Sequence, residues 1–315
     1  ERGLPVIVTD HHEIQKELPE ADAVVDPKRE DCSYPFKGLC GAGVAFQLIS
    51  ALYEKMGISA EKREELLEYV AIATVADVME LQGENRVLVK AGLRKLVGTK
   101  NVGLRALLDV QGLSGRDIKA YHIGFVLGPC FNAAGRINTV EKAFALLKET
   151  DSRKALELAE ELKEINETRK QMTEEAAEAA FELLEQGGKT GQPVYILHLP
   201  ECHESLVGIV AGRIKEAYHH PVIVFTSVGE GLVKGSGRSI ESYHMFEGLM
   251  ACSDLMVRFG GHRMAAGMTM RQENLPELER RLNEKASLQP EDFIPVLNID
   301  VPLPVGYVSE KLIAD

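Results

Sequence analysis

The sequence has no long apolar stretch, and this absence excludes a membrane-spanning helix. No run of 18 or more apolar residues occurs in its 315 positions. The first residues, Glu1-Arg2-Gly3-Leu4-Pro5, also lack the basic and then apolar layout of a secretory signal. We therefore expect a cytoplasmic protein that makes no contact with a membrane.

Cysteine is too sparse and too scattered to build a disulfide framework or a structural zinc site. The cysteines are odd in number, and no two have the short spacing of a zinc knuckle. They are Cys32, Cys40, Cys130, Cys202 and Cys252. We expect reduced thiols that are mostly packed in the interior.

An excess of positive charge is also missing. The formal net charge of -12 at pH 7 argues against a protein that coats nucleic acid through bulk electrostatics. The charge is uneven, because residues 151–190 hold eleven acids and six bases, whereas residues 203–271 hold seven bases, six acids and five histidines. A polyanion would therefore bind in a local cleft.

Length and patterning predict two α/β domains. With 45% apolar residues, the chain is long enough to bury two cores. We expect a partial parallel-sheet domain over residues 1–150, a long connecting helix over 151–188, and a smaller α/β domain over 189–288. Alternating residues near 296–302 indicate the first strand of a further, OB-fold-like module that starts within residues 289–315.

The first domain is predicted to open on strands. Residues 4–9 form a β-branched apolar run typical of a buried parallel strand, and residues 23–27 predict a second strand. Helical patterns follow over residues 42–56, 60–76 and 84–98. Because a strand needs neighbours and no initiator methionine is present, we expect a piece of a longer protein that begins within a sheet.

Residues 151–186 contain neither proline nor glycine, and they predict one long helix or two in line. Apolar residues follow a three-four repeat that only Arg169 breaks. At about 1.5 Å per residue the helix would span roughly 50 Å, and Gly187-Gly188 would end it. We expect a strut between domains in a monomer; a coiled-coil hairpin or a dimerisation helix is the alternative.

The second domain is predicted to begin with a β-α-β unit. Its predicted strands cover residues 194–197 and 221–225, with a helix over 206–218 between them. The remaining predicted elements are strands near 232–239 and 265–270 and helices near 244–258 and 274–286.

Two polar features suit metal chemistry. Asp10-His11-His12 follows the first strand, where an α/β sheet places its active site, and its imidazoles and carboxylate suit a cation such as manganese. Asp77 lies in the apolar context Val75-Ala76-Asp77-Val78, which would desolvate it unless a cation is its partner. Capping or packing roles are the structural alternatives for both.

Three glycine-rich segments would let a substrate approach the backbone closely. Residues 127–136 have too little side-chain bulk for a core segment, and their Arg136 could meet a phosphate. Gly235-Ser236-Gly237-Arg238-Ser239 offers hydroxyls and a guanidinium to a terminal phosphate. In Gly260-Gly261-His262 the histidine could donate to an anion. Tight turns are the alternative for the last two.

In this order, the segments resemble the RecJ branch of the DHH phosphoesterase family over nearly the whole chain. VTDHH, VADVMEL and LGPCFNAAGR resemble its metal and channel motifs, and HESLVGIVAGR, GSGRS and GGHRMAAG resemble its DHH-associated domain. The resemblance implies a metal-dependent 5′-to-3′ exonuclease of single-stranded DNA in repair and recombination. Two manganese or magnesium ions would activate water for in-line attack. Single-strand-binding protein and a helicase are further implied partners.

The resemblance also implies roles for single residues. His11 and Asp77 would be metal ligands, His12 would contact the scissile phosphate, and Asp10 would orient the histidines. The implied substrate-binding residues are Asn132 and Arg136 in the strand channel, and His203, Ser236, Arg238, Gly260, Gly261 and His262 in the second domain. Of these, Ser236, Arg238 and Gly261 would hold the 5′ end of the strand.

Three departures from the family pattern matter. The family's earlier acidic motifs should precede the DHH triplet, and no residues here carry them. Cys130 stands where the pattern has arginine, and Ser205 stands where a glycine is expected after His203-Glu204. Since two ligands cannot hold two ions, we expect this piece to bind manganese weakly and to cleave little.

Two other functions share some of these motifs. A small-substrate DHH phosphoesterase, acting on oligoribonucleotides or nucleotides, would share DHH and GGH but would not require the long helix or the further module. A non-catalytic replication or repair scaffold would fit if the acidic motifs are absent from the parent gene.

Overall fold

The computed structural model describes residues 3–14, 18–137 and 140–314. The chain divides into two compact units, Glu1–Lys170 (unit 1) and Gln171–Asp315 (unit 2). Each unit has its own sheet and its own buried core. The fold is mixed α/β, as the sequence predicts.

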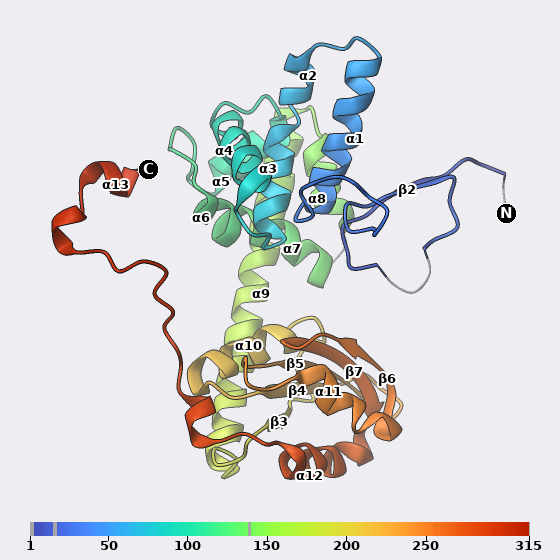
Figure 1. Ribbon diagram of the computed structural model, residues 1–315, viewed down its shortest axis with the longest axis vertical. Coiled ribbons are helices and arrows are strands. Elements are labelled where there is room, and N and C mark those ends of the chain that lie inside the picture. Colours follow the sequence, from blue (N-terminus) through green and yellow to red (C-terminus); the bar gives the residue numbers. More distant parts are fainter. Residues whose placement is uncertain (1–2, 15–17, 138–139, 315) are drawn as a thin grey trace. The chain divides into compact units, whose positions relative to one another are not determined.

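Unit 1 is mainly helical (Figure 1). Its helices are α1 (Gly41–Lys55), α2 (Ala60–Glu64), α3 (Leu67–Ala76), α4 (Gly83–Val97), α5 (Val102–Val110), α6 (Ala120–His122), the π-helix η1 (Ile123–Leu127), α7 (Gly128–Ile137) and α8 (Val140–Lys148). The helices predicted at 42–56 and 84–98 are confirmed as α1 and α4, whereas the pattern at 60–76 divides into α2 and α3.

The core of unit 1 lies between its helices. Leu107, Leu127, Leu146 and Leu162, from four different helices, are at most 1% exposed and belong to one cluster. Full burial of such side chains stabilises a fold by roughly 1.5–3 kcal/mol each. This helical core, rather than the sheet, carries most of the apolar burial in unit 1.

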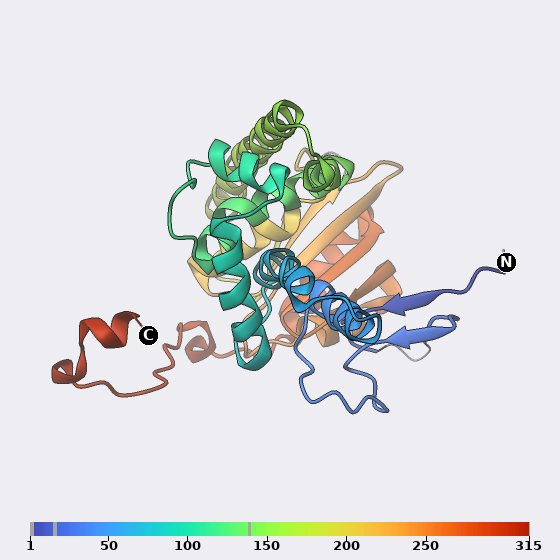
Figure 2. The ribbon, with the colours of Figure 1, turned by 90° about the horizontal axis from the view of Figure 1, so that it is seen from above.

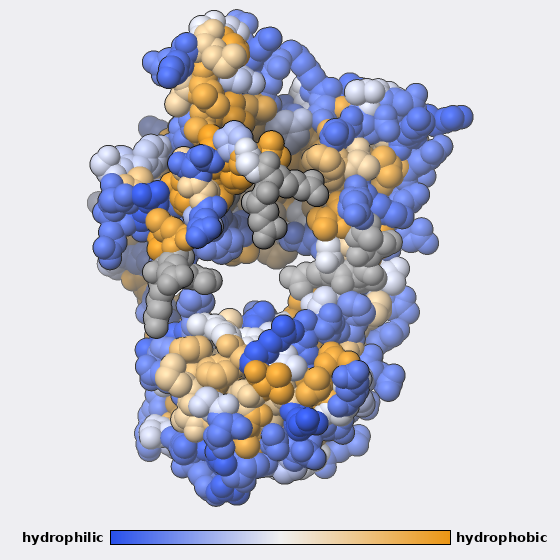
Figure 3. Space-filling view, turned by 90° about the vertical axis from the view of Figure 1, so that its right-hand side faces the viewer, coloured by the Kyte–Doolittle hydropathy of each residue, from blue (hydrophilic) through white to orange (hydrophobic). Residues whose placement is uncertain are grey.

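A short parallel pair of strands lies beside α1 (Figure 2). β1 (Ile7–Thr9) pairs with β2 (Ala23–Val25), and the Asp10 N–H continues the ladder to the Val25 carbonyl at 3.0 Å. The prediction of a buried first strand is wrong, because Ile7 is 61% exposed. Among the described strands β1 has only β2 as a neighbour, so much of its surface is left open. Figure 3 shows apolar patches on this side of unit 1.

The long helix predicted at 151–186 is confirmed as a single helix, α9 (Ser152–Gln186). Ala155, Ala159 and Leu162 are fully buried in the core of unit 1. Ala180 and Leu184 are fully buried in a core of unit 2. The three-four repeat therefore supplies side chains to two cores from one continuous helix.

Unit 2 is built on a five-stranded sheet of order β3-β4-β5-β7-β6. Its strands are β3 (Tyr195–His198), β4 (Val222–Ser227), β5 (Leu232–Arg238), β6 (Met256–Gly261) and β7 (Ala265–Arg271). β3 and β4 are parallel and are joined through α10 (Val207–Tyr218), which confirms the β-α-β unit. The other pairs are antiparallel.

Helices cover both faces of this sheet (Figure 1). The second half of α9 and α10 pack on the face that carries Tyr195 and Val224. α11 (Met245–Met250) and α12 (Leu275–Lys285) pack on the opposite face, which carries Phe225 and Met268. This arrangement follows from the alternation of side chains along each strand.

Two predicted elements of the second half are wrong. The helix predicted at 244–258 ends at Met250, and β6 begins at Met256, because a 3-10 turn over Ser253–Leu255 reverses the chain. The strand predicted near 296–302 does not form among the described residues, where prolines and the lack of a partner strand leave irregular chain between Phe293 and Val305. Within the described ranges, no helix is both long and apolar enough to cross a membrane.

Candidate metal and phosphate sites

Asp10 organises the turn that follows β1. Its Oδ1 atom accepts hydrogen bonds from the His11 N–H at 2.7 Å and the His12 N–H at 3.3 Å. The same oxygen lies 2.7 Å from His12 Nδ1. These contacts, with the His12 ring first and the His11 backbone second, hold the pKa of Asp10 below its ordinary value. Asp10 therefore restrains the ring of His12 and the backbone of the turn.

Asp77 lies at the carboxyl end of α3. The Met79 N–H bonds to the Thr74 carbonyl and the Val78 N–H bonds to the Val75 carbonyl, both at 3.1 Å, which is the Schellman pattern of a helix end. The position that glycine usually fills is Val78, with φ of 56°. The backbone at Val78 is therefore strained, immediately beside the candidate ligand.

His11 and Asp77 lie close together, as the family resemblance implies. His11 Nε2 lies 3.6 Å from Asp77 Oδ2, and the His11 ring also packs on Gly41, the first residue of α1. The expected desolvation of Asp77 is wrong, because its side chain is 48% exposed, against 17% for His11. The helix end projects the carboxylate out of the apolar context of α3 instead of burying it.

Asp10 and His12 also line a cavity at the carboxyl ends of β1 and β2. The cavity has a volume of about 510 Å³ and is bordered by Val8, Glu13 and the buried Asp26 as well. Parallel sheets bind ligands at this end of their strands. Asp10 and His12 are thus placed where small polar ligands have access.

The donors at this edge fit a divalent cation. One ligand atom from each of Asp10, His11 and His12 lies within 4.8 Å of the others, and Asp77 adds a carboxylate beside His11. Imidazole nitrogen and carboxylate oxygen suit manganese, and carboxylate oxygen suits magnesium. Asp10 accepts three hydrogen bonds through Oδ1, so a cation bound with His11 and Asp77 would find its Oδ2 atom the more available oxygen.

The glycine- and alanine-rich segment at 127–136 is a packed helix, so the expectation that it lacks bulk for a core is wrong. Cys130, Ala133 and Ala134 are fully buried, and burial raises the pKa of Cys130 to about 11. A Cβ on Gly128 would lie 3.2 Å from Ala76 Cβ, so the small residues let α7 approach α3 closely beside Asp77. Asn132 is exposed on α7, and the side chain of Arg136 lies outside the described residues.

A second polar site lies within the sheet of unit 2. The Arg238 Nη1 atom donates to Ser236 Oγ at 2.9 Å and to the Gly237 carbonyl at 2.8 Å. Ser236 pairs with Gly267 across the β5–β7 ladder, and Gly267 pairs with Gly260 across the β7–β6 ladder. A Cβ on Gly260 or Gly267 would meet no atom within 4 Å, so the backbone beside Ser236 is open.

Gly261 and the two predicted histidines have different environments. Gly261 has φ of 152°, and a Cβ there would lie 2.5 Å from the Ala265 carbonyl oxygen, so only glycine fits. The exposed His262 begins the turn to β7, with its N–H bonded to Ala265. His203 lies before α10, and its Nδ1 atom is 2.8 Å from Ser205 Oγ.

Sequence reasoning missed three residues on or next to the strand that carries this second site, namely Gly208, Glu204 and Lys234. Gly208, in the first turn of α10, approaches both Ser236 and Arg238. Glu204 forms an ion pair with Lys234 at 2.8 Å, and this contact lowers the pKa of Glu204. Gly208 is a glycine inside a helical pattern, which is a signal of close packing.

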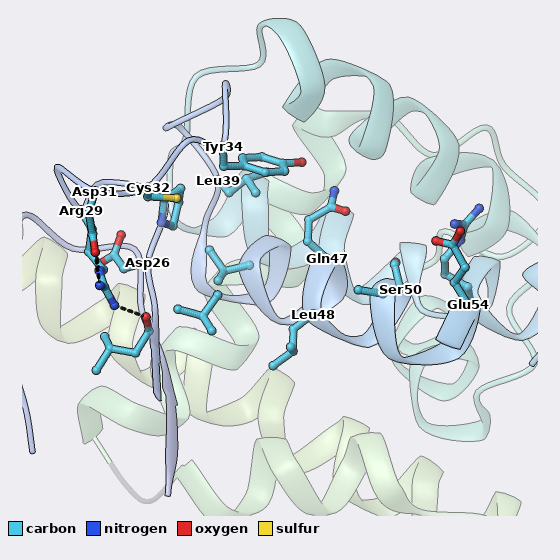
Figure 4. Close-up of a pocket in the computed structure, with 16 residues that line it drawn as sticks. Asp26, Arg29, Asp31, Cys32, Tyr34, Leu39, Gln47, Leu48, Ser50 and Glu54 are labelled. Carbon is cyan, nitrogen blue, oxygen red and sulfur yellow. Dashed lines mark hydrogen bonds and ion pairs between the residues drawn. The ribbon is translucent and has the colours of Figure 1, made fainter. Parts of the chain in front are cut away.

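A larger cavity of about 630 Å³ lies between β2 and α1 and contains neither His11 nor Asp77 (Figure 4). Side chains such as Val25, Leu39 and Leu48 line it, and Arg29 at its edge is already paired with Asp31. We assign no chemistry to it, because its polar groups do not converge on one point.

Two family models match the chain, one within each unit. "DHH family, N-terminal domain" matches residues 1–74, and "DHHA1 domain" matches residues 191–288. The single-stranded-DNA-specific exonuclease RecJ of Bacillus subtilis is 41% identical over 318 aligned residues, which cover 100% of this chain and 40% of the relative.

Solved structures of RecJ are similar in fold as well. RecJ of Thermus thermophilus in complex with Mn²⁺ matches with a TM-score of 0.78 at 36% identity, over 90% of this chain and 41% of that one. An exonuclease RecJ bound to manganese matches with a TM-score of 0.76 at 35% identity, over 92% of this chain and 71% of that one. The chain belongs to the RecJ family.

Membership in the RecJ family explains why the motifs occur in this order in both units. The chain spans between 40% and 57% of the length of the curated RecJ-type relatives that it matches. The RecJ structure from Thermus thermophilus has also been determined in complex with Mg²⁺.

Proposed function

We propose that the chain carries the cation-binding and strand-binding parts of a 5′-to-3′ exonuclease that hydrolyses single-stranded DNA. The approach of His11 Nε2 to Asp77 Oδ2, at 3.6 Å, is the observation that supports this most strongly. It brings two metal-type donors together from a strand end and a helix end. The similarity to single-strand-specific RecJ exonucleases supplies the substrate class.

In this proposal His11 and Asp77 hold manganese or magnesium, which supplies Lewis-acid activation of water and of the phosphate. His12 contacts the scissile phosphate. Because the Asp10 carboxylate can only accept, His12 Nδ1 carries a hydrogen. A hydrogen bond to a phosphate oxygen also requires a hydrogen on Nε2, so the ring would act in its protonated form, with its direction set by Asp10.

Ser236 and Arg238 would hold the phosphate at the 5′ end of the strand, with the open backbone of Gly260 and Gly261 beside them. Asn132, Arg136, His203 and His262 would contact the rest of the substrate. Recognition of the terminal phosphate by Ser236 and Arg238 would restrict cleavage to the 5′ end of the strand. Action in the cytoplasm as a monomer, with single-strand-binding protein and a helicase as partners in repair and recombination, completes the proposal.

The test uses the full-length protein with Mn²⁺ and a single strand labelled at either end. We expect mononucleotides to be released from the 5′ end, duplex DNA to resist, and His11→Ala to lower the rate by at least about a hundredfold. Release from the 3′ end would reject the assigned direction, and an unchanged rate in the His11→Ala variant would reject the assigned cation site. Preference for dinucleotides over long strands would instead favour a small-substrate phosphoesterase.

A further inference from the structure

Gly208 occupies an unusual position in unit 2. It is the second residue of α10, and it faces the two polar side chains of the neighbouring strand β5. An ideal Cβ built on Gly208 would lie 2.8 Å from Arg238 Nη2, 2.9 Å from Ser236 Oγ and 3.4 Å from Arg238 Cζ. Carbon atoms in ordinary contact are about 3.5–4.0 Å from their neighbours. No side chain larger than hydrogen fits at this position unless both polar groups move.

The groups that crowd Gly208 are linked to each other. Arg238 Nη1 donates to Ser236 Oγ at 2.9 Å and to the Gly237 carbonyl at 2.8 Å. A methyl group at position 208 would therefore displace the guanidinium and the hydroxyl together. Both are ends of side chains, so the fold can accommodate the shift, but their common orientation would be lost.

Backbone conformation does not require glycine at this position. Gly208 is helical, and its φ is not among the positive values in the chain. Glycine inside a helix costs up to about 1 kcal/mol relative to alanine. Glycine at position 208 therefore does not stabilise α10. What it provides is space for the side chains of Arg238 and Ser236.

We propose that Gly208 is a positioning residue for the 5′-phosphate pocket: it leaves the space in which Arg238 and Ser236 present their donors side by side. This inference rests on the proposed function, because it assigns the pocket the same ligand. Gly208→Ala then weakens phosphate binding while the helix itself gains propensity. The two effects have opposite signs, which separates a positioning role from a purely structural one.

The matched control is on the same helix. Gly212 lies one turn further along α10, and a Cβ there would meet no atom within 4 Å. Gly212→Ala gains the same helix propensity without touching the pocket. Arg238→Gln tests the pocket itself, because it removes the guanidinium charge.

The experiment uses the 315-residue chain without divalent cations, so that no cleavage occurs. The probe is a 3′-labelled oligothymidylate of about ten nucleotides, compared with and without a 5′ phosphate by fluorescence anisotropy. We expect the ratio of the two affinities to fall by about tenfold in Gly208→Ala, the size of one charge-assisted contact, and to change less than about twofold in Gly212→Ala. Thermal unfolding of both variants should match or exceed that of the parent chain.

The outcomes separate the two proposals. If Arg238→Gln removes the preference for the 5′ phosphate and Gly208→Ala does not change it, the role of Gly208 is rejected and the pocket stands. If Arg238→Gln has no effect, or if the parent chain shows no preference for the phosphate, the pocket is rejected and the inference falls with it. An equal loss of the preference for the 5′ phosphate in Gly208→Ala and Gly212→Ala would show that Gly208 has only a structural role.

Discussion

Beside the candidate site of unit 2, the residue with the unusual backbone is a glycine, whereas beside the candidate site of unit 1 it is a valine. Gly261 has φ of 152° and no room for a Cβ, and glycine is the residue that this backbone conformation requires. Val78 has φ of 56° next to Asp77, a conformation that costs a β-branched residue roughly 1–2 kcal/mol. Unit 2 presents its donors from a relaxed ladder, and unit 1 presents its carboxylate from a strained helix end.

The difference follows from where the two sites are built. Ser236 and Arg238 lie within a strand that is paired on both sides, so the sheet fixes their direction. Asp77 lies at the end of α3, and Asp10 lies beyond the end of a three-residue strand. Chain ends can be turned to aim a ligand, but they have fewer hydrogen bonds to hold them. A cation that joins His11 to Asp77 would supply the missing restraint.

The largest expected effect tests the donor pair of unit 1. Asp77→Asn should weaken Mn²⁺ binding to the 315-residue chain by at least about tenfold, because it replaces a charged ligand by a neutral one. Titration followed by the electron paramagnetic resonance of free Mn²⁺ measures this. Glu80→Gln, which removes a carboxylate three residues further on, is the control and should have little effect. Equal affinities in all three chains would separate Asp77 from the cation site.

The next effect tests the glycine of unit 2. Gly261→Ala should lower the free energy of unfolding by roughly 2–3 kcal/mol, because the methyl group meets backbone atoms at 2.5 Å. Gly260→Ala, one residue earlier on the same strand, has open space around its Cβ and should cost much less. Chemical denaturation of both variants gives the comparison. Similar losses would show that the strand, and not the conformation at Gly261, is sensitive.

A smaller effect of opposite sign tests the valine of unit 1. Val78→Gly should raise the free energy of unfolding by about 1 kcal/mol, because glycine adopts the left-handed conformation without strain. Val87→Gly, at an exposed position inside α4, should be slightly destabilising. Thermal unfolding distinguishes the signs. A loss of stability in Val78→Gly would mean that the exposed valine side chain makes contacts that outweigh its strain.

The smallest effect concerns the opposite end of α3, where unit 1 tolerates a buried carboxyl group. Burial raises the pKa of Glu68 above its ordinary value of 4.5, and Thr99 Oγ1 donates to it at 3.0 Å. The ionised form of Glu68 is thus disfavoured in the folded state. The free energy of unfolding is therefore highest below pH 4.5 with respect to this group, and it declines as the pH rises through the raised pKa. Glu68→Gln should equal the parent chain at about pH 4 and exceed it at about pH 7, by up to about 1 kcal/mol.

The control for that pH profile is Glu65→Gln. Lys100 lowers the pKa of the exposed Glu65, so this variant should have the opposite sign at neutral pH. Denaturation at the two pH values measures both. A Glu68→Gln variant that gains nothing between the acidic and the neutral pH would contradict the assigned cost of burial.

The sequence predicts best those elements in which apolar residues recur at a regular spacing over many positions. α9 and the β3-α10-β4 unit follow from spacing alone. The sequence does not predict β6, because residues 256–261 overlap and follow the predicted helix at 244–258. They form a strand because they pair with β7, whose residues lie further along the chain. Residues 127–136 were misinterpreted because small side chains suit a close helix contact as well as an open loop.

Prediction of the candidate sites has the same limit. Asp10 with His12 is a local arrangement, and its hydrogen bonds follow from adjacent residues. The meeting of His11 with Asp77 was expected from the family resemblance, and no pattern in the sequence alone requires it. The exposure of Asp77 and the crowding at Gly208 depend on a helix end and on a helix-to-sheet contact. Neither can be derived from residues that are adjacent in the sequence.

The continuity of α9 has a consequence for how the chain acquires its structure. Starting a helix is costly, and extending one is cheap. One core contains Leu162 and the other contains Leu184. The core that forms first therefore nucleates α9, and the helix can then extend toward the other core. Folding of the two halves is coupled along a single backbone, and stability gained in one core helps order the residues that complete the other.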